Sequence, residues 1–268
     1  MKTVTAKGRL GQQTKGLTCE NRLRQIDTFI CIQYNGLIQR KDAIFVDVGF
    51  GKYPTTTLET HRRLKALNSV IKTIGTEINT ERYLYAKNYE QANAEFRLGG
   101  FNLPLHRDEK ASIIRCYNVL RQYPEDEFLA AIENMGRYLV NGGIIIEGTS
   151  DQFGRLISFN LFEKLDNRIC NLGLVFGTNF RSPFYPRDFQ SVLPRNLIQR
   201  MITGEWIYQF FDDWNSSFYK VINKFAGMRQ IFYETAIILH KEYKYPVMIA
   251  KRLLRKGFLV VGNIEKHI

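Results

Sequence analysis

Apolar and polar positions along the chain fall into short blocks that switch repeatedly between strand-like and helix-like spacing. Strand-like runs, rich in β-branched and aromatic residues, are expected at residues 43–48, 70–77, 94–98, 112–117 and 143–148. Helix-compatible spacing is expected at residues 26–37, 55–67, 80–92 and 125–140. Strands that alternate with helices in this way predict a parallel sheet with right-handed crossovers.

Local signals support several of these boundaries. Pro54 suits the first turn of a helix, because the missing N–H is unpaired there in any case. Asn79 or Thr80 can cap the helix expected at 80–92. Asn141, Gly142 and Gly143 are expected to stop the helix that precedes the fifth strand.

After Asp151 the pattern changes. Two strand-like segments, 156–165 and 172–180, flank the turn-like Asp166-Asn167-Arg168 and predict an antiparallel hairpin. Aromatic-rich helices broken near Gly227 follow at 205–242, then a short basic helix at 246–255 and the apolar run 258–261. The expected fold is an α/β, Rossmann-like doubly wound sheet, mostly parallel, with an antiparallel terminal hairpin and C-terminal helices. We expect three parts: a basic N-terminal arm at 1–25, a nucleotide-binding domain at 26–182 and a C-terminal helical region at 183–268.

The turn after the first strand reads Asp47-Val48-Gly49-Phe50-Gly51. Two glycines let a ligand approach the backbone, although a tight strand-to-helix turn can need glycine for its conformation alone. The dinucleotide fingerprint has a third glycine where this chain has Pro54, which argues against NAD. The second strand ends in Glu77, whose carboxylate could accept ribose hydroxyls.

This turn, Glu77 and the order of the later strands resemble the class I S-adenosylmethionine-dependent methyltransferases over residues 40–150, and loosely to 180. Segments 96–104, 118–123 and 147–151 are similar to those of a bacterial methyltransferase-like group with no assigned substrate. The resemblance implies S-adenosylmethionine as the cofactor. It further implies a cofactor site made by Asp47, Gly49, Phe50, Gly51, Glu77, Gly100, Phe101, Asn102 and Asn118.

Within that site, the resemblance assigns Glu77 to the ribose, Phe101 and Asn102 to the adenine, and Asn118 to the neighbourhood of the methyl group. Where the family often has an acid or Asn-Pro, this chain has Asn118-Val119-Leu120. That departure argues against methylation of a base amino group by the Asn-Pro type of site. Tentative catalytic residues are Asn118, Asp151 and Glu147, although a carboxylate at a strand end is often a cap or a charge partner.

Composition narrows the class of protein. No apolar run reaches the roughly 18 residues that would span a bilayer. Cys19, Cys31, Cys116 and Cys170 are scattered and predict reduced thiols in a cytoplasmic protein, and neither these nor the four histidines predict a metal site. Arg115 lies in an apolar strand and must have an acidic or ligand partner that the sequence does not identify.

The net charge of +12 concentrates at the two ends of the chain. Residues 1–25 hold six basic residues and one acidic residue, and residues 241–268 hold seven and two. Between residues 152 and 203 the only lysine is Lys164, whereas six arginines occur. Arginine suits planar anions, so we expect a small anionic methyl acceptor bound by Arg155, Arg181 and Arg195. RNA as the acceptor, and a non-catalytic binding protein on the same fold, are the alternatives.

Overall fold

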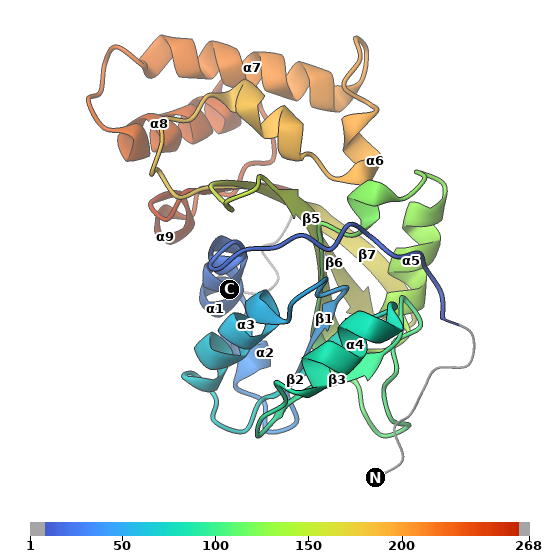
Figure 1. Ribbon diagram of the computed structural model, residues 1–268. Helices are drawn as coiled ribbons and strands as arrows, with labels where there is room; N and C mark the ends of the chain where they lie inside the picture. Colours follow the sequence, from blue (N-terminus) through green and yellow to red (C-terminus); the bar gives the residue numbers. More distant parts are fainter. Residues whose placement is uncertain (1–8, 263–268) are drawn as a thin grey trace.

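The computed structural model describes residues 9–262, in which eight strands form one sheet in the order β3-β2-β1-β4-β5-β6-β7-β8 (Figure 1). The first five strands of this order pair in parallel. Their bounds are β1 Ile44–Val48, β2 Lys72–Glu77, β3 Ala94–Leu98, β4 Ala111–Tyr117 and β5 Leu139–Ser150. The order reverses between β1 and β4, and the carboxyl ends of both strands lie at the same edge of the sheet. The predicted Rossmann-like arrangement is therefore confirmed.

The other end of the sheet is antiparallel. β6 (Leu156–Leu165) and β7 (Arg168–Thr178) form the predicted hairpin, and Asp166 turns the chain with a φ of 54°. The apolar run 258–261 forms a further strand, β8 (Phe258–Val261), which pairs antiparallel with β7. Residues from the expected C-terminal region therefore complete the sheet, and the three-part division of the chain stays a prediction.

Helices cover both faces of the sheet (Figure 1). One face carries α1 (Arg24–Gln33), α2 (Asn35–Ile38), α3 (Thr55–Lys65), α4 (Thr80–Lys87) and α9 (Lys251–Leu254). The other carries α5 (Glu127–Gly136), α6 (Arg195–Ile198), α7 (Trp206–Val221) and α8 (Met228–Lys241), with the 3-10 turns η1 (Leu120–Gln122) and η2 (Pro186–Val192). The alternating strand and helix pattern thus produces a three-layer α/β protein.

The aromatic segment of α7 forms core. Phe210, Phe211 and Trp214 are buried against Phe176 of β7, and Trp214 stacks on Phe189 at a centroid distance of 5.1 Å. The helices α7 and α8 are separated near Gly227, as predicted. This packing binds the C-terminal helices to the antiparallel half of the sheet.

Three helix predictions were too long. The helix expected at 80–92 ends at Lys87, and the helix expected at 125–140 ends at Gly136. Asn141, Gly142 and Gly143, predicted to stop that helix, lie inside β5, because the chain already pairs with β4 from Leu139. The helix expected at 246–255 forms only over Lys251–Leu254. In each case pairing with the rest of the protein overrides local propensity.

Candidate functional site

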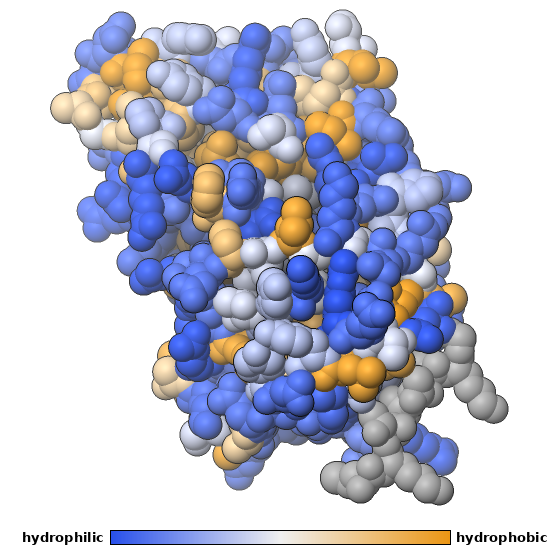
Figure 2. Space-filling model, viewed as in Figure 1, coloured by the Kyte–Doolittle hydropathy of each residue, from blue (hydrophilic) through white to orange (hydrophobic). Residues whose placement is uncertain are grey.

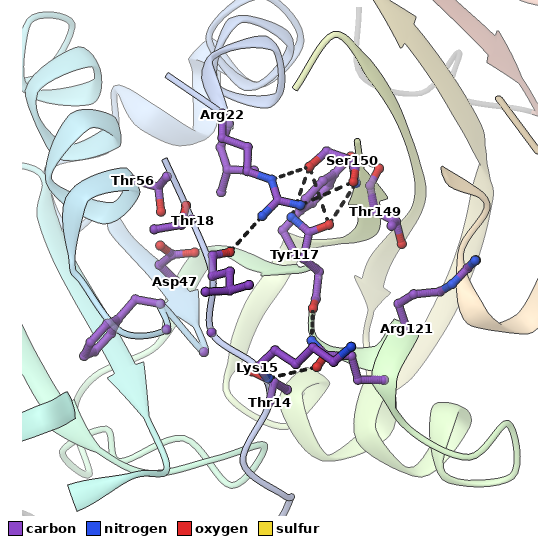
Figure 3. A pocket seen from close by; sticks show the side chains of 18 residues that line it. Thr14, Lys15, Thr18, Arg22, Asp47, Thr56, Tyr117, Arg121, Thr149 and Ser150 are labelled. Atoms are coloured by element: carbon purple, nitrogen blue, oxygen red, sulfur yellow. Dashed lines mark hydrogen bonds between the residues drawn. The ribbon is translucent and has the colours of Figure 1, made fainter. Parts of the chain in front are cut away.

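A cavity of about 280 Å³ lies at the carboxyl ends of β1, β4 and β5, at the point where the strand order reverses (Figure 3). Open parallel sheets bind their ligands at this position. The turn after β1 and the start of α3 contribute Asp47, Gly49, Phe50, Gly51 and Thr56. The ends of β4 and β5 contribute Tyr117, Asn118, Arg121, Gln122, Thr149 and Ser150.

The N-terminal segment closes this cavity. In Figure 1 it is the dark blue trace that crosses the strand ends before entering α1. Its residues Thr14 to Thr18, with Arg22 and Leu23, line the cavity. Arg22 donates from Nε to Ser150 Oγ over 3.1 Å, as Figure 3 shows, and the Lys52 N–H donates to Gly16 O over 2.9 Å. The sequence predicted a loose arm, whereas the described part of it is held at the rim.

Asp47, predicted to orient the glycine turn, is paired with Arg115. The guanidinium donates from Nε and Nη2 to the two Asp47 oxygens over 2.9 and 2.8 Å. Thr57 Oγ1 donates to Asp47 Oδ2 over 2.6 Å. Asp47 therefore lines the cavity with a carboxylate that is already engaged, and it fixes the end of β1 relative to β4.

Arg115, whose partner the sequence did not identify, is paired with a second aspartate as well. Arg115 Nη1 also donates to Asp27 Oδ1 of α1 over 2.7 Å, and Asp27 pairs with Arg63 of α3 at 2.5 Å. Arg115 is fully buried. Burial alone favours loss of its proton, but the carboxylates of Asp47 and Asp27 outweigh burial and raise the pKa of Arg115. Arg115 thus ties β4 to β1 and α1, and the partly exposed Arg63 joins α3 to the same group.

The glycine turn and Glu77 contact each other directly. Gly49 and Gly51 have φ values of 71° and 86°, which only glycine adopts readily. The Gly51 N–H donates to Glu77 Oε2 over 3.0 Å. Glu77 Oε1 accepts from the N–H groups of Ile78 and Asn79. Three backbone donors therefore surround the Glu77 carboxylate at the end of β2, and its predicted contact with ribose stays a prediction. The Phe50 side chain is buried against Phe96, and Phe50 also lines the cavity.

The residues predicted to meet adenine are occupied by the N-terminal segment. The Phe101 N–H donates to Leu10 O over 2.9 Å, and Asn102 Oδ1 accepts from the Leu10 N–H over 2.8 Å. Tyr123 bonds both backbone groups of Gln12. The backbone N–H of Leu10 thus bonds the Asn102 side chain, and the backbone carbonyl of Leu10 bonds the Phe101 N–H, just after the end of β3.

The space left beside these residues is small. A cavity of about 20 Å³ is lined by Glu77, Gly100, Phe101, Val119 and Tyr123, with Leu10, Gln12 and Thr14 of the segment among the remaining lining residues. That volume holds about one water molecule. A Cβ atom on Gly100 would lie 1.9 Å from Leu10 O, so glycine at this position permits the close approach of the segment.

The tentative catalytic residues do not come together. Asn118 lines the cavity, and its amide accepts from the Ser150 N–H and donates to Ser150 Oγ. Asp151 caps the next turn by accepting from the N–H groups of Phe153 and Arg155, and it does not line the cavity. Glu147 is fully buried between strands beside Asn160, and burial raises its pKa to about 8.

The three arginines predicted to bind the acceptor also separate. Arg155 and Arg181 line one polar cleft beside α1, together with Arg24, Arg229, Arg255 and Lys256. Arg195 lies outside this cleft and close to Arg121. Burial lowers the pKa of Arg121, and the positive charge of Arg195 lowers it further. The sequence pattern did not indicate the other four cations, because they come from three segments outside residues 152–203.

Other cavity residues were also missed. Tyr117, Thr149 and Arg22 also line the cavity, although no individual role was predicted for them. Their positions at the ends of β4 and β5, and Arg22 in a basic arm, are the features that could have indicated them. Over residues 9–262 there is no cluster of potential metal ligands and no helix able to span a membrane.

No family model and no curated protein sequence matches the chain. Solved structures give partial matches. The plantazolicin methyltransferase BamL, crystallised with a triazolic desmethylPZN analog and SAH, is 18% identical over 49% of this chain and 47% of its own, with a TM-score of 0.38. A putative sarcosine dimethylglycine methyltransferase from Galdieria sulphuraria is 17% identical over 52% of this chain and 53% of its own, with a TM-score of 0.36.

A putative protein-L-isoaspartate O-methyltransferase from Plasmodium falciparum, in complex with S-adenosyl-L-homocysteine, is 13% identical over 55% of this chain and 69% of its own, with a TM-score of 0.35. The chain thus spans about half the length of the first two of these proteins. Identities this low concern the arrangement of elements alone.

Proposed function

We propose that the protein is an S-adenosylmethionine-dependent methyltransferase. The observation that supports this most strongly is the cavity at the reversal of strand order, bordered by a Gly49–Gly51 turn and lying beside Glu77. A nucleoside cofactor bound there would have its amino-acid part in the 280 Å³ cavity and its ribose at Glu77. Phe101 and Asn102 would meet the adenine through the same N–H and carbonyl oxygen that now bond Leu10.

The residues fit this group in their chemistry, although the N-terminal segment covers part of the site. The amide oxygen of Asn102 and the N–H of Phe101 match the amino donor and ring acceptor of adenine. A 20 Å³ cavity cannot hold an adenosine, so residues 10–14 must leave before the cofactor binds. Leu10 thus occupies the position proposed for adenine.

The proposed chemistry depends on positioning. When bound, the cofactor supplies a methyl group on a sulfonium, and the acceptor attacks in line with the departing sulfur. Asp47 is the single carboxylate among the described cavity residues, and Arg115 and Thr57 engage it. No histidine lines this cavity within the described chain. The protein would therefore hold the reactants together and exclude water, and Asn118 would shape the floor without removing a proton.

The experiment that tests the proposal is calorimetry with S-adenosylmethionine, S-adenosylhomocysteine and NAD. We expect micromolar binding of both S-adenosyl ligands and none of NAD. Binding of NAD alone would overturn the proposal. Incubation with methyl-labelled cofactor and fractionated extract would then assign the acceptor to small molecules, RNA or protein.

A non-catalytic binding protein is the second candidate. The coverage of the nucleotide-binding residues by Leu10 and Gln12 favours it. Cofactor binding without transfer of label to any extract fraction would support this candidate.

For a methyltransferase, we propose a negatively charged acceptor, because Arg155 and Arg181 lie together in a basic cleft.

A further inference from the structure

A polar cleft of about 760 Å³ lies beside α1, away from the cavity at the strand ends. Six cations line it: Arg24, Arg155, Arg181, Arg229, Arg255 and Lys256. The cleft holds one acidic lining residue, Glu20. Figure 2 shows hydrophilic side chains over this part of the molecule, where α1 and α9 lie. The cleft is therefore strongly electropositive and distinct from the cofactor cavity.

These cations have no protein counter-ions among residues 9–262. None of the six forms a salt bridge there. Other arginines of the protein do pair with acids, including Arg63, Arg97 and Arg115. Like charges gathered without partners repel one another, and a bound polyanion would relieve that repulsion.

The arrangement of the cations indicates a ligand with several charges. They come from α1, the β5–β6 turn, the segment after β7, the start of α8 and the residues after α9. Five of the six are arginines, whose planar donors match phosphate oxygens. One phosphate would fill a small part of 760 Å³, so an extended chain of phosphates suits the cleft better.

One exposed aromatic ring accompanies the cations. Phe153 lines the cleft with 59% of its surface exposed, and the Arg155 guanidinium lies 5.4 Å from its ring centroid. Exposed aromatic rings beside a basic groove stack nucleobases in proteins that bind single strands. An acidic protein partner could pair with the cations, but it would supply no nucleobase to stack on this ring. A nucleic acid supplies both phosphates and bases.

We propose that this cleft binds the phosphodiester backbone of a single-stranded nucleic acid. This inference rests on the proposed methyl transfer in one respect, because it identifies the methyl acceptor as a nucleic acid. The N-terminal segment separates the two sites: Leu17, Thr18 and Arg22 line the cofactor cavity, whereas Cys19, Glu20 and Arg24 line the cleft. A nucleic-acid strand bound in the cleft would thus be separated from the cofactor cavity only by this part of the N-terminal segment.

The test measures binding of a fluorescent 12-nucleotide oligouridylate by anisotropy at 50 and 200 mM NaCl. Each phosphate contact by a single strand contributes about 0.7 to the slope of log affinity against log salt. Three to six contacts would weaken binding roughly 20-fold to roughly 300-fold over this range. An oligothymidylate and inorganic tripolyphosphate serve as competitors that separate RNA, DNA and free polyphosphate.

The decisive variant is Arg181→Glu combined with Arg255→Glu. We expect binding at least roughly tenfold weaker and a salt slope shallower by about 1.4, for two lost contacts. The matched control is Arg137→Glu combined with Arg168→Glu, which changes the net charge equally at two exposed arginines outside the cleft. The control should bind within about twofold of the parent protein, because only the cleft makes phosphate contacts.

Equal weakening of both double variants would overturn the inference, as would tripolyphosphate competing as well as the oligonucleotide. Calorimetry with S-adenosylhomocysteine on the same samples separates the two proposals. If the cofactor binds and no oligonucleotide does, the nucleic-acid inference fails alone. If oligonucleotide binds and the S-adenosyl ligands do not, the cleft assignment stands and the methyltransferase proposal fails.

Discussion

At the scale of single residues, backbone groups, hydroxyls and buried charges hold the polar side chains of the site. Glu77 accepts hydrogen bonds from Gly51, Ile78 and Asn79, and the proposed ribose would share the same carboxylate. The side chain thus serves both the shape of the glycine turn and the ligand. A change at Glu77 should therefore affect cofactor affinity and folding stability together.

We expect Glu77→Ala to weaken S-adenosylhomocysteine binding by about 1.5 to 3 kcal/mol, which is about 10-fold to 150-fold. Glu77→Gln should be milder, because the amide oxygen still accepts one hydrogen bond. Calorimetry measures both variants, and Glu81→Ala on the exposed first turn of α4 is the control. Parental affinity in a folded Glu77→Ala protein would contradict the ribose assignment.

Glu147 predicts a pH dependence of stability. Burial raises the pKa of Glu147 from an ordinary 4.5 to about 8, so the folded protein holds a proton that the unfolded chain releases. The folded state then binds more protons between those two values, and stability falls as pH rises through this window. Above pH 8 the loss levels off.

Relative to Glu147→Gln, the parent protein should lose up to about 1.4 kcal/mol of unfolding free energy per pH unit between pH 5 and 8. Urea unfolding at several pH values measures this difference. Glu133→Gln, on the exposed face of α5, should follow the parent protein. If Glu147→Gln and the parent protein show parallel pH profiles, Glu147 is ionised when folded.

At the scale of elements, the N-terminal segment controls access to the strand ends. Its contacts span the whole rim: Leu10 with Phe101 and Asn102, Gln12 with Tyr123, and Gly16 with the glycine turn. Arg82 of α4 also donates to the carbonyl oxygens of Thr14 and Lys15. These bonds use backbone groups of the segment, and its path also requires glycine at positions 11 and 16, where φ is 122° and 68°.

Displacement of the segment by the cofactor should be visible to trypsin, which cuts after Arg9 and Lys15. We expect S-adenosylhomocysteine to accelerate both cuts, because proteolysis tracks the opened population. Tyr123→Phe should accelerate them without ligand, since two lost hydrogen bonds shift the opening by about 1 to 3 kcal/mol, or about 5-fold to 150-fold.

Cleavage after Arg168, the exposed first residue of β7, serves as the internal reference and should not change with ligand. Protection of Arg9 and Lys15 by the ligand would show the opposite arrangement, in which the segment stays in place and covers the bound cofactor. That result would contradict displacement of Leu10 from the adenine position.

At the scale of the whole molecule, the C-terminal helices and the sheet share one core. Leu174 and Phe176 of β7 and Leu259 and Val261 of β8 pack under α7 and α8. A cut after residue 182 would expose this face of β7 and leave its edge unpaired. The sheet and the helices should therefore unfold together.

Both tryptophans, Trp206 and Trp214, lie in α7, so tryptophan fluorescence reports on the C-terminal layer alone. Far-UV circular dichroism reports on the whole chain. We expect the two probes to give the same urea midpoint, which is the mark of a two-state transition. A chain truncated after residue 182 should lack a cooperative transition. Separate midpoints would instead support an independently folding C-terminal region.

The sequence alone predicts the parallel half of the sheet, the β6–β7 turn and the glycine turn at the end of β1. These features follow from local rules: strand and helix periodicity, glycine at positive φ, and turn residues between apolar runs. A single continuous stretch of chain carries each signal. The position of Asn118 at the end of β4 follows from the same order of elements.

Only the tertiary structure decided which polar groups meet. Arg115 is paired by Asp47 and Asp27, which lie 68 and 88 positions away along the chain. Leu10 reaches Asn102 across 92 positions, and the basic cleft gathers cations from five segments. Such contacts depend on how the layers pack, because hydrogen bonds and charge pairs leave no periodic pattern in the sequence. The early end of the helix before β5 has the same cause, since pairing with β4 outweighs local helix propensity.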